Sequence, residues 1–148
     1  MGVIHLIAGR FRFACGVIAA GLLLACGPAS SADPFPFDRE LLLDAAPMRP
    51  AKRMPSLTVA PNGEATIDLW CKTVSARVEF TDAAIKIEPG PLPEALPEMM
   101  GAGQCSPQRM RADEDMLATL AQMTAWRQQG GALVLVGPKL LKFRAATN

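Results

Sequence analysis

The chain of 148 residues has few of the side chains that most enzymes and metal proteins use. It contains one histidine, no tyrosine, two tryptophans and four cysteines. A single histidine excludes a metal centre with several imidazole ligands. The 15 lysines and arginines balance 14 acids and give a formal charge of +1, so the chain lacks the basic excess of a nucleic-acid-binding domain. Half of the residues are hydrophobic, and the length suits one domain with a tail.

The N-terminal segment is basic and apolar. Arg10 and Arg12 are the only ionised side chains before Asp33, and the run Phe13–Ala25 is apolar or small. Thirteen helical residues span about 20 Å, which is too short for a hydrocarbon core of about 30 Å. A basic stretch, a short apolar run and a small-residue cleavage site are typical of a secretory signal peptide. We therefore expect residues 1–25 to be a signal peptide.

The end of this segment, Leu23-Leu24-Ala25-Cys26, resembles a bacterial lipobox, in which the cysteine becomes the lipidated N-terminus. The alternative is an ordinary signal peptide whose cysteine is accidental. Acyl chains contribute roughly 0.8 kcal/mol per buried methylene, so several of them hold a protein firmly on a membrane. Gly27 stands where an aspartate would indicate the inner membrane. The resemblance implies a lipid anchor at Cys26 in the outer membrane, with the domain facing the periplasm.

Removal of residues 1–25 changes what the composition excludes. The remaining 123 residues carry 13 basic and 14 acidic side chains, a charge of −1, and His5 is lost. With it go the usual general base at neutral pH and the usual nitrogen ligand of a metal. Schemes that pair a serine or a cysteine with a histidine become impossible within the chain. We expect no catalytic residues, no metal and no cofactor.

Proline is abundant after the lipobox, with seven prolines among the 35 residues from Gly27 to Pro61. Because proline stiffens a spacer and prevents helix formation, residues 26–36 are predicted to be a tether. Exposed rings on a free linker are unfavourable, so Phe35 and Phe37 are expected to dock onto the domain. We place that domain at residues 37–145.

Short alternating runs predict antiparallel strands with one buried face. Ile67 and Leu69, for example, share a face that excludes Asp68. Asn62-Gly63 is expected to supply the positive φ angles of a two-residue hairpin turn. The expected strands are Glu40–Asp44, Leu57–Ala60, Ala65–Trp70, Ala76–Phe80, Ala84–Glu88, Ala132–Val136 and Leu140–Arg144.

One helix is expected after Ser106. This residue and Pro107 form a helix start, a capping hydroxyl followed by the residue tolerated at the first helical position. Apolar residues recur at three- and four-residue steps up to Thr124, and Trp126 closes the helical region. The predicted fold class is α+β, an antiparallel meander of six to seven short strands packed on one amphipathic helix. The charged residues expected to form a solvated surface are Arg109, Arg111, Asp113, Glu114 and Asp115.

The segment 89–104 holds four prolines and three glycines and is predicted to be a long loop without regular structure. Such loops are often functional. Met99 and Met100 are flexible apolar side chains that suit either a core or a contact with a ligand or partner. Together with Trp126 they are the candidate site for a small apolar ligand.

Two cysteines, Cys71 and Cys105, remain in the domain beyond Cys15 and Cys26. In an exported protein such a pair is interpreted first as a disulfide. Closing a loop of about 35 residues stabilises the fold by roughly 3–4 kcal/mol in the chain-entropy model. The alternatives are two free buried thiols or a reactive thiol, although no C-x-x-C spacing and no histidine support the latter.

Several segments occur in an order that is found in one known family. Leu57–Gly63 is a strand and turn, Trp70-Cys71-Lys72 follows where that family usually has Gly-Cys-Asn, and Gln104-Cys105 precedes the helix. The closing hairpin contains Leu133–Leu135 and Leu141–Phe143. Through this order the domain resembles META domains, the family of the heat-shock protein HslJ.

The resemblance implies an antiparallel β structure with a packed helix, in exported or membrane-attached proteins linked to stress tolerance. The family has no general catalytic residue set. Trp70 and Lys72 replace the glycine and asparagine of its most recognisable motif, so functions tied to those small residues are not carried over.

Three functions are therefore compared. The first is a non-enzymatic envelope lipoprotein that binds an envelope protein or a wall component and supports envelope integrity or stress tolerance. The second is a periplasmic binder of small apolar ligands near Met99, Met100 and Trp126. The third is an enzyme that uses Asp68, Asp113, Glu114 or Cys71; it is the weakest, because paired acids on one helix usually form a solvated face.

Overall fold

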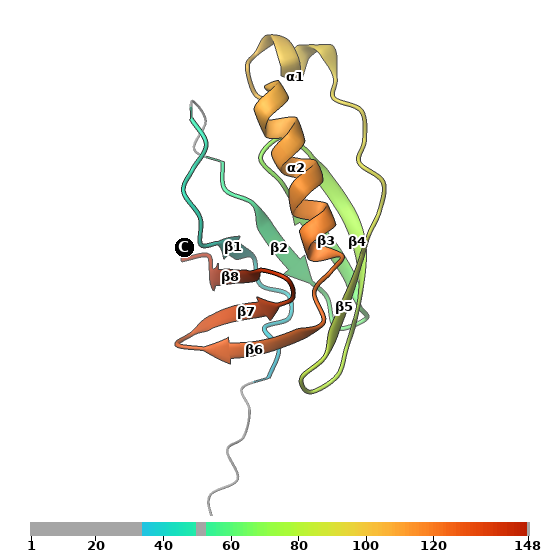
Figure 1. Ribbon diagram of the computed structural model, residues 1–148, viewed down its shortest axis with the longest axis vertical. Helices are drawn as coiled ribbons and strands as arrows, with labels where there is room; N and C mark the ends of the chain where they lie inside the picture. Colours follow the sequence, from blue (N-terminus) through green and yellow to red (C-terminus); the bar gives the residue numbers. More distant parts are fainter. Residues whose placement is uncertain (1–33, 50–52, 148) are drawn as a thin grey trace, which may run out of the picture. The chain divides into compact units, whose positions relative to one another are not determined.

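The computed structural model describes residues 34–49 and 53–147. Within these ranges the chain forms eight strands and two helices (Figure 1). The predicted signal peptide, the lipidation at Cys26 and most of the predicted tether lie outside the described residues. The strands are β1 (Leu41–Leu43), β2 (Ser56–Val59), β3 (Glu64–Asp68), β4 (Thr73–Phe80), β5 (Ile85–Pro89), β6 (Ala125–Gln129), β7 (Ala132–Val136) and β8 (Leu140–Ala145). The helices are α1 (Pro97–Gly101) and α2 (Pro107–Leu120).

The strands form one antiparallel sheet in the order β5-β4-β3-β2-β1-β8-β7-β6. Its two edge strands, β5 and β6, also meet. The N–H of Ile85 donates to the carbonyl of Thr124 at 3.1 Å, and the N–H of Trp126 donates to the carbonyl of Ala83 at 2.9 Å. The sheet therefore curls into a nearly closed barrel.

The predicted fold class, a meander of six to seven strands packed on one helix, is wrong. The described chain has eight strands in a barrel-like sheet, and its only helix of more than one or two turns is α2. Two long-range pairings produce the barrel: β5 meets β6, and Leu41 of β1 pairs with Ala145 of β8. Alternation within one strand carries no information about such pairings, because it reports only which face is buried.

The predicted helix extends too far. In the structure, α2 ends at Leu120. Thr124 donates its N–H to the carbonyl of Val136 at 2.9 Å, and Trp126 lies on β6. The next turn, Gly130-Gly131, has φ angles of 60° and 74°. Two positive φ angles in a two-residue loop define a tight hairpin turn, and such a turn requires a strand on each side.

The turn between β2 and β3 has three residues, Pro61–Gly63, between the hydrogen-bonded Ala60 and Glu64, and is not a two-residue hairpin turn. Only Gly63 has a positive φ, of 82°, so the expectation of a positive φ at Asn62 is wrong. The Asn62 side chain instead accepts the N–H of Glu64 at 3.0 Å, and the N–H of Ala60 donates to the carbonyl of Glu64 at 2.8 Å. A Cβ atom on Gly63 would lie 2.5 Å from the carbonyl oxygen of Val78. The close approach of β4 therefore requires glycine.

The inward residues of the strands and one face of α2 share a single core. On β3, Ala65 and Ile67 are buried while Glu64 and Thr66 are exposed, as expected for a sheet with one wet face. Full burial of a leucine or isoleucine contributes roughly 1.5–3 kcal/mol. The most deeply buried members include Leu41, Leu57, Val59, Ile67, Leu120, Leu133, Leu135 and Phe143.

The two phenylalanines ahead of β1 dock on the barrel, as expected. Phe35 is 6% exposed and belongs to the core, and Phe37 is partly buried against it. Since Phe35 lies in the predicted tether, packing begins before residue 37.

Candidate functional site

Cys71 and Cys105 form a disulfide, with their Cα atoms 5.0 Å apart. The predicted disulfide is thereby confirmed over two free thiols. Both residues are 1% exposed. The bond joins the β3–β4 connection to the residue before the helix cap, Ser106. Ser106 caps α2 as predicted: its side chain accepts the N–H of Arg109, and Pro107 occupies the first turn.

Asp113 of α2 is fully buried beside this disulfide. Its carboxylate accepts the backbone N–H of Cys71 at 3.2 Å and that of Lys72 at 3.1 Å. Burial raises the pKa of Asp113, against the opposing effect of hydrogen bonds from the N–H groups of Cys71, Lys72 and Trp70 and of the Lys72 charge. The expectation that Asp113 lies on a solvated surface is wrong, because its carboxylate caps the backbone after β3.

Arg109 lies one turn before Asp113 and is 2% exposed, so its expected place on a solvated surface is also wrong. Its guanidinium donates to the carbonyl of Gln104 at 2.9 Å and to that of Met48 at 2.7 Å. A buried cation with backbone acceptors on two segments fixes their separation. The disulfide, Asp113 and Arg109 together hold the start of α2 against the β3–β4 connection and the segment before β2.

The other acids considered for catalysis occupy different environments. Asp68 accepts hydrogen bonds from the Arg53 guanidinium at 2.8 Å and from the Thr73 hydroxyl. Glu114 is exposed on α2. Among the described residues, no group of three or more histidine, cysteine or acidic side chains could hold a metal ion.

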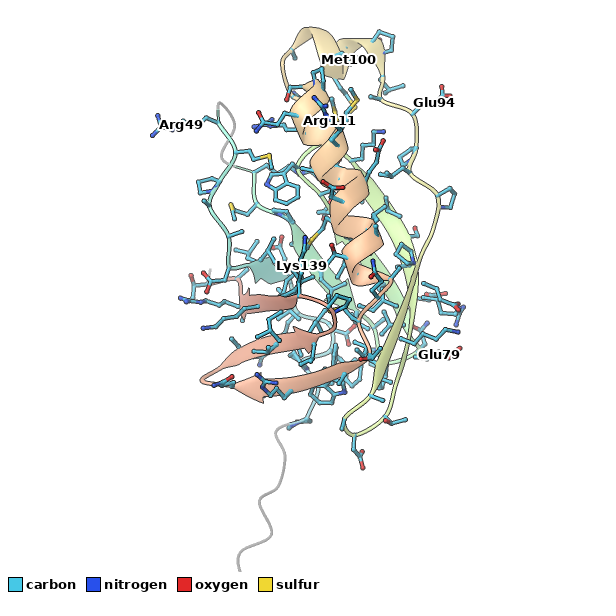
Figure 2. The ribbon with its side chains drawn as sticks, viewed as in Figure 1. Arg49, Glu79, Glu94, Met100, Arg111 and Lys139 are labelled. Carbon is cyan, nitrogen blue, oxygen red and sulfur yellow. A yellow bond between two sulfur atoms is a disulfide. The ribbon has the colours of Figure 1, made fainter. Side chains whose placement is uncertain are left out.

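The structure does not bring Met99, Met100 and Trp126 into one site. The two methionines lie on α1, a one-turn helix within the segment predicted to lack regular structure, and Met100 is 48% exposed. Trp126 lies on β6, beyond the other end of α2, whose 14 residues span about 21 Å. Figure 1 shows α1 and β6 at opposite ends of the molecule, and Figure 2 shows Met100 at the α1 end.

Trp126 instead belongs to an aromatic cluster at the β6 end of the barrel. Its ring lies 5.1 Å from that of Phe35, edge to face, and Phe35 stacks on Phe80 at 5.6 Å. The indole N–H of Trp126 donates to the carbonyl of Thr81 at 2.9 Å. A hollow of about 440 Å³ is lined by Pro34, Phe35, Phe37, Phe80, Thr81, Asp82 and Trp126. We call it the aromatic pocket.

A second hollow, of about 580 Å³, is lined by residues of β2–β5 and of the segments next to these strands. Its lining includes the hydroxyl side chains of Thr58, Thr66 and Ser75 and the charged side chains of Glu64 and Arg77. It offers hydroxyl and charged groups but no apolar ring.

The fold and these sites define a class: a small β-barrel domain with one packed helix tied to it by a disulfide. A family model described as the META domain matches residues 41–147, more than two-thirds of the chain, and the chain therefore belongs to the META domain family. The predicted resemblance to META domains is thus confirmed. Comparisons with curated proteins and with solved structures gave no significant match. None of the described helices has the length and apolar character needed to cross a membrane.

Proposed function

We propose that the chain is a non-enzymatic, lipid-anchored protein of the cell envelope whose META domain binds an envelope partner. The observation that carries the proposal is the succession of two features. A lipobox-like Leu23–Cys26 closes a signal-like segment, and eight residues after Cys26 the chain reaches Pro34, next to the buried Phe35. Membership of the META family and the disulfide, a bond typical of exported proteins, support the same setting.

The contacts of the acidic side chains support a binding role rather than a reaction. Both oxygens of Asp113 face backbone N–H groups, and Asp68 is paired with Arg53. Catalysis needs titratable groups that converge on a cleft and face a substrate. A rigid barrel held by a disulfide is suited to present a fixed surface to a protein or wall component, and through it to support envelope integrity or stress tolerance.

The anchor is tested by Cys26→Ser. We expect this variant to move from salt-washed membranes to the soluble periplasmic fraction. Cys15→Ser, a change within the same N-terminal segment, is the matched control and should fractionate like the unmodified chain. Membrane retention of Cys26→Ser equal to that of Cys15→Ser would exclude the lipid anchor.

The partner is tested by crosslinking in intact cells, followed by purification of the anchored protein. We expect one envelope protein or wall component to be recovered with the unmodified chain and to be reduced with Cys26→Ser. Recovery of nothing specific across growth and stress conditions would contradict the partner role.

The aromatic pocket favours a second candidate function, the binding of a small apolar ligand. Four rings line a hollow large enough for such a ligand, and Trp126 is a fluorescent reporter within it. We expect an apolar ligand to change the tryptophan emission and Phe37→Ala to weaken its binding. Leu96→Ala, a change at an exposed residue that does not line the pocket, should bind normally. An unchanged emission across lipids and apolar drugs would exclude this function.

A further inference from the structure

The outer face of the β6–β7–β8 sheet carries a set of basic side chains. Because side chains alternate along a strand, the inward Leu133 and Leu135 place Val134 outward. Val134 pairs with Arg127 on one side and with Lys142 on the other. Arg144, two residues beyond Lys142, shares the same face, and Lys139 lies in the β7–β8 turn. We call Arg127, Lys142 and Arg144 the basic face.

The centre of this face is apolar and covered. Val134 points outward yet is only 5% exposed, and Ala132 is 2% exposed. Long basic side chains on the flanking strands cover such positions with their aliphatic stems and leave their charges in water. Lys142 and Arg144 accordingly have side chains that are 47% and 63% exposed.

The charge of the basic face is one-sided. No aspartate or glutamate occurs from Met116 to Asn148. Among the described residues one acid, Asp44, contacts the face, at 2.8 Å from Arg144 and 4.0 Å from Lys142. The outer face of β4 and β5 is different, because its Lys86 pairs with Glu88 at 2.6 Å.

The basic face also lies beside the start of the domain. The side-chain amide of Gln128, next to Arg127 on β6, donates to the carbonyl of Pro34 at 2.6 Å. Pro34 is eight positions after Cys26, and an extended chain covers at most about 3.5 Å per residue. A lipid on Cys26 therefore keeps β6 within about 30 Å of the bilayer surface.

We propose that the basic face docks on the anionic phospholipid headgroups of the bilayer that holds the anchor; this rests on the proposed lipid anchor. Each phosphate is a site for the guanidinium and ammonium groups of the face. Leu140, 62% exposed beside Lys139, adds an apolar side chain for the interface between headgroups and acyl chains. The docked domain then has one fixed orientation, with β6–β8 toward the membrane and β2–β5 away from it.

The test uses the chain as the cell makes it with the single change Cys26→Ser, so that no lipid contributes to binding. Sedimentation with vesicles of phosphatidylcholine alone is compared with vesicles that also contain phosphatidylglycerol. We expect binding only to the anionic vesicles and loss of binding at high salt, where exposed charges are screened. Equal binding to both kinds of vesicle, or to neither, would overturn the proposal.

Two triple variants separate the basic face from net charge. Each cation near an anionic surface contributes roughly fivefold in affinity, so Arg127→Gln, Lys142→Gln and Arg144→Gln together should weaken binding by about 100-fold. Arg77→Gln, Lys86→Gln and Arg111→Gln remove the same charge elsewhere and should change it by less than about threefold. Equal losses of vesicle binding in the two triple variants would overturn the proposal. Binding of the Cys26→Ser chain to DNA but not to anionic vesicles would also overturn it.

Folding and the anchor are controlled separately. Circular dichroism melting reports whether each triple variant folds, and Arg127→Gln alone should still weaken binding by about fivefold. Lys142→Arg keeps the charge and should bind normally. If Cys26→Ser leaves salt-washed membranes but does not bind anionic vesicles, the lipid anchor stands and the docking proposal fails.

Discussion

The carboxylate of Asp113 accepts the backbone N–H of Cys71 at 3.2 Å, and Cys71 is at the same time the disulfide partner of Cys105, just before α2. One helix is thus joined to one strand connection twice, by a covalent bond and by a buried charge-assisted hydrogen bond.

Replacement of Asp113 by alanine should destabilise the fold. The N–H groups of Cys71 and Lys72 would stay buried without their acceptor, at a cost of about 2–4 kcal/mol in the free energy of unfolding. Urea denaturation of Asp113→Ala and of the unmodified chain measures this loss of unfolding free energy. Glu114→Ala, a change at the neighbouring exposed acid, should stay within about 0.5 kcal/mol. Equal effects at the two positions would show that Asp113 has no special role.

Stability should depend on pH through Asp113. Burial raises its pKa in the folded chain above the ordinary value of 3.8, so between the two values the folded state binds more protons than the unfolded state. The unfolding free energy then falls as the pH rises through that window. Asp113→Asn does not titrate. From about pH 4 upward, we expect the unfolding free energy of the unmodified chain to fall relative to that of Asp113→Asn. Urea denaturation at a series of pH values measures both, and parallel pH dependences would contradict this.

Loss of the disulfide should cost roughly 3–4 kcal/mol of unfolding free energy. Cys71→Ala with Cys105→Ala removes it without leaving a thiol, and urea denaturation of this variant measures the loss. Reductant should lower the melting temperature of the unmodified chain but not that of the variant. A melting temperature that is insensitive to reductant in both proteins, after mass spectrometry confirms reduction, would contradict the expectation.

Two glycines with similar backbone angles should respond differently to alanine. Gly63 and Gly130 both have positive φ, so each substitution costs about 1 kcal/mol in backbone strain. At Gly63 the new Cβ also meets the carbonyl oxygen of Val78 at 2.5 Å, whereas nothing lies within 4 Å at Gly130. Gly63→Ala should therefore lower the melting temperature clearly more than Gly130→Ala. Equal decreases would show that β4 yields without cost.

The local elements of this fold could be predicted from the sequence, and their assembly could not. Seven strands and the Ser106 cap follow from alternation and capping chemistry, which act between near neighbours. The pairing of Leu41 with Ala145 joins positions about a hundred residues apart, and no local pattern reports it. The pattern does not predict β6, because Met123 and Trp126 continue an apolar spacing that is compatible with either a helix or a strand.

The cluster beside the disulfide was missed for a different reason. Arg109, Asp113, Met116, Leu117 and Leu120 follow one another at helical steps, so the spacing alone places all five on one face. Arg109 and Asp113 are nevertheless predicted to be exposed, because arginine and aspartate are seldom buried unless they are paired. Here Asp113 accepts backbone N–H groups of the distant β3–β4 connection, and Arg109 donates to the backbone carbonyls of Gln104 and Met48. In related chains, an arginine and an aspartate at positions i and i+4 on an apolar helix face therefore indicate buried charges that bind backbone groups.

The position of β1 between β2 and β8 has a consequence for how the chain is completed. During synthesis β1 leaves the ribosome before the other strands. One side of β1 then stays without a partner until Ala145 of β8 is available. The barrel can therefore close only after the last strand has emerged, and pairing over such a sequence separation is slow. Until then β1 has a partner on one side only, in β2.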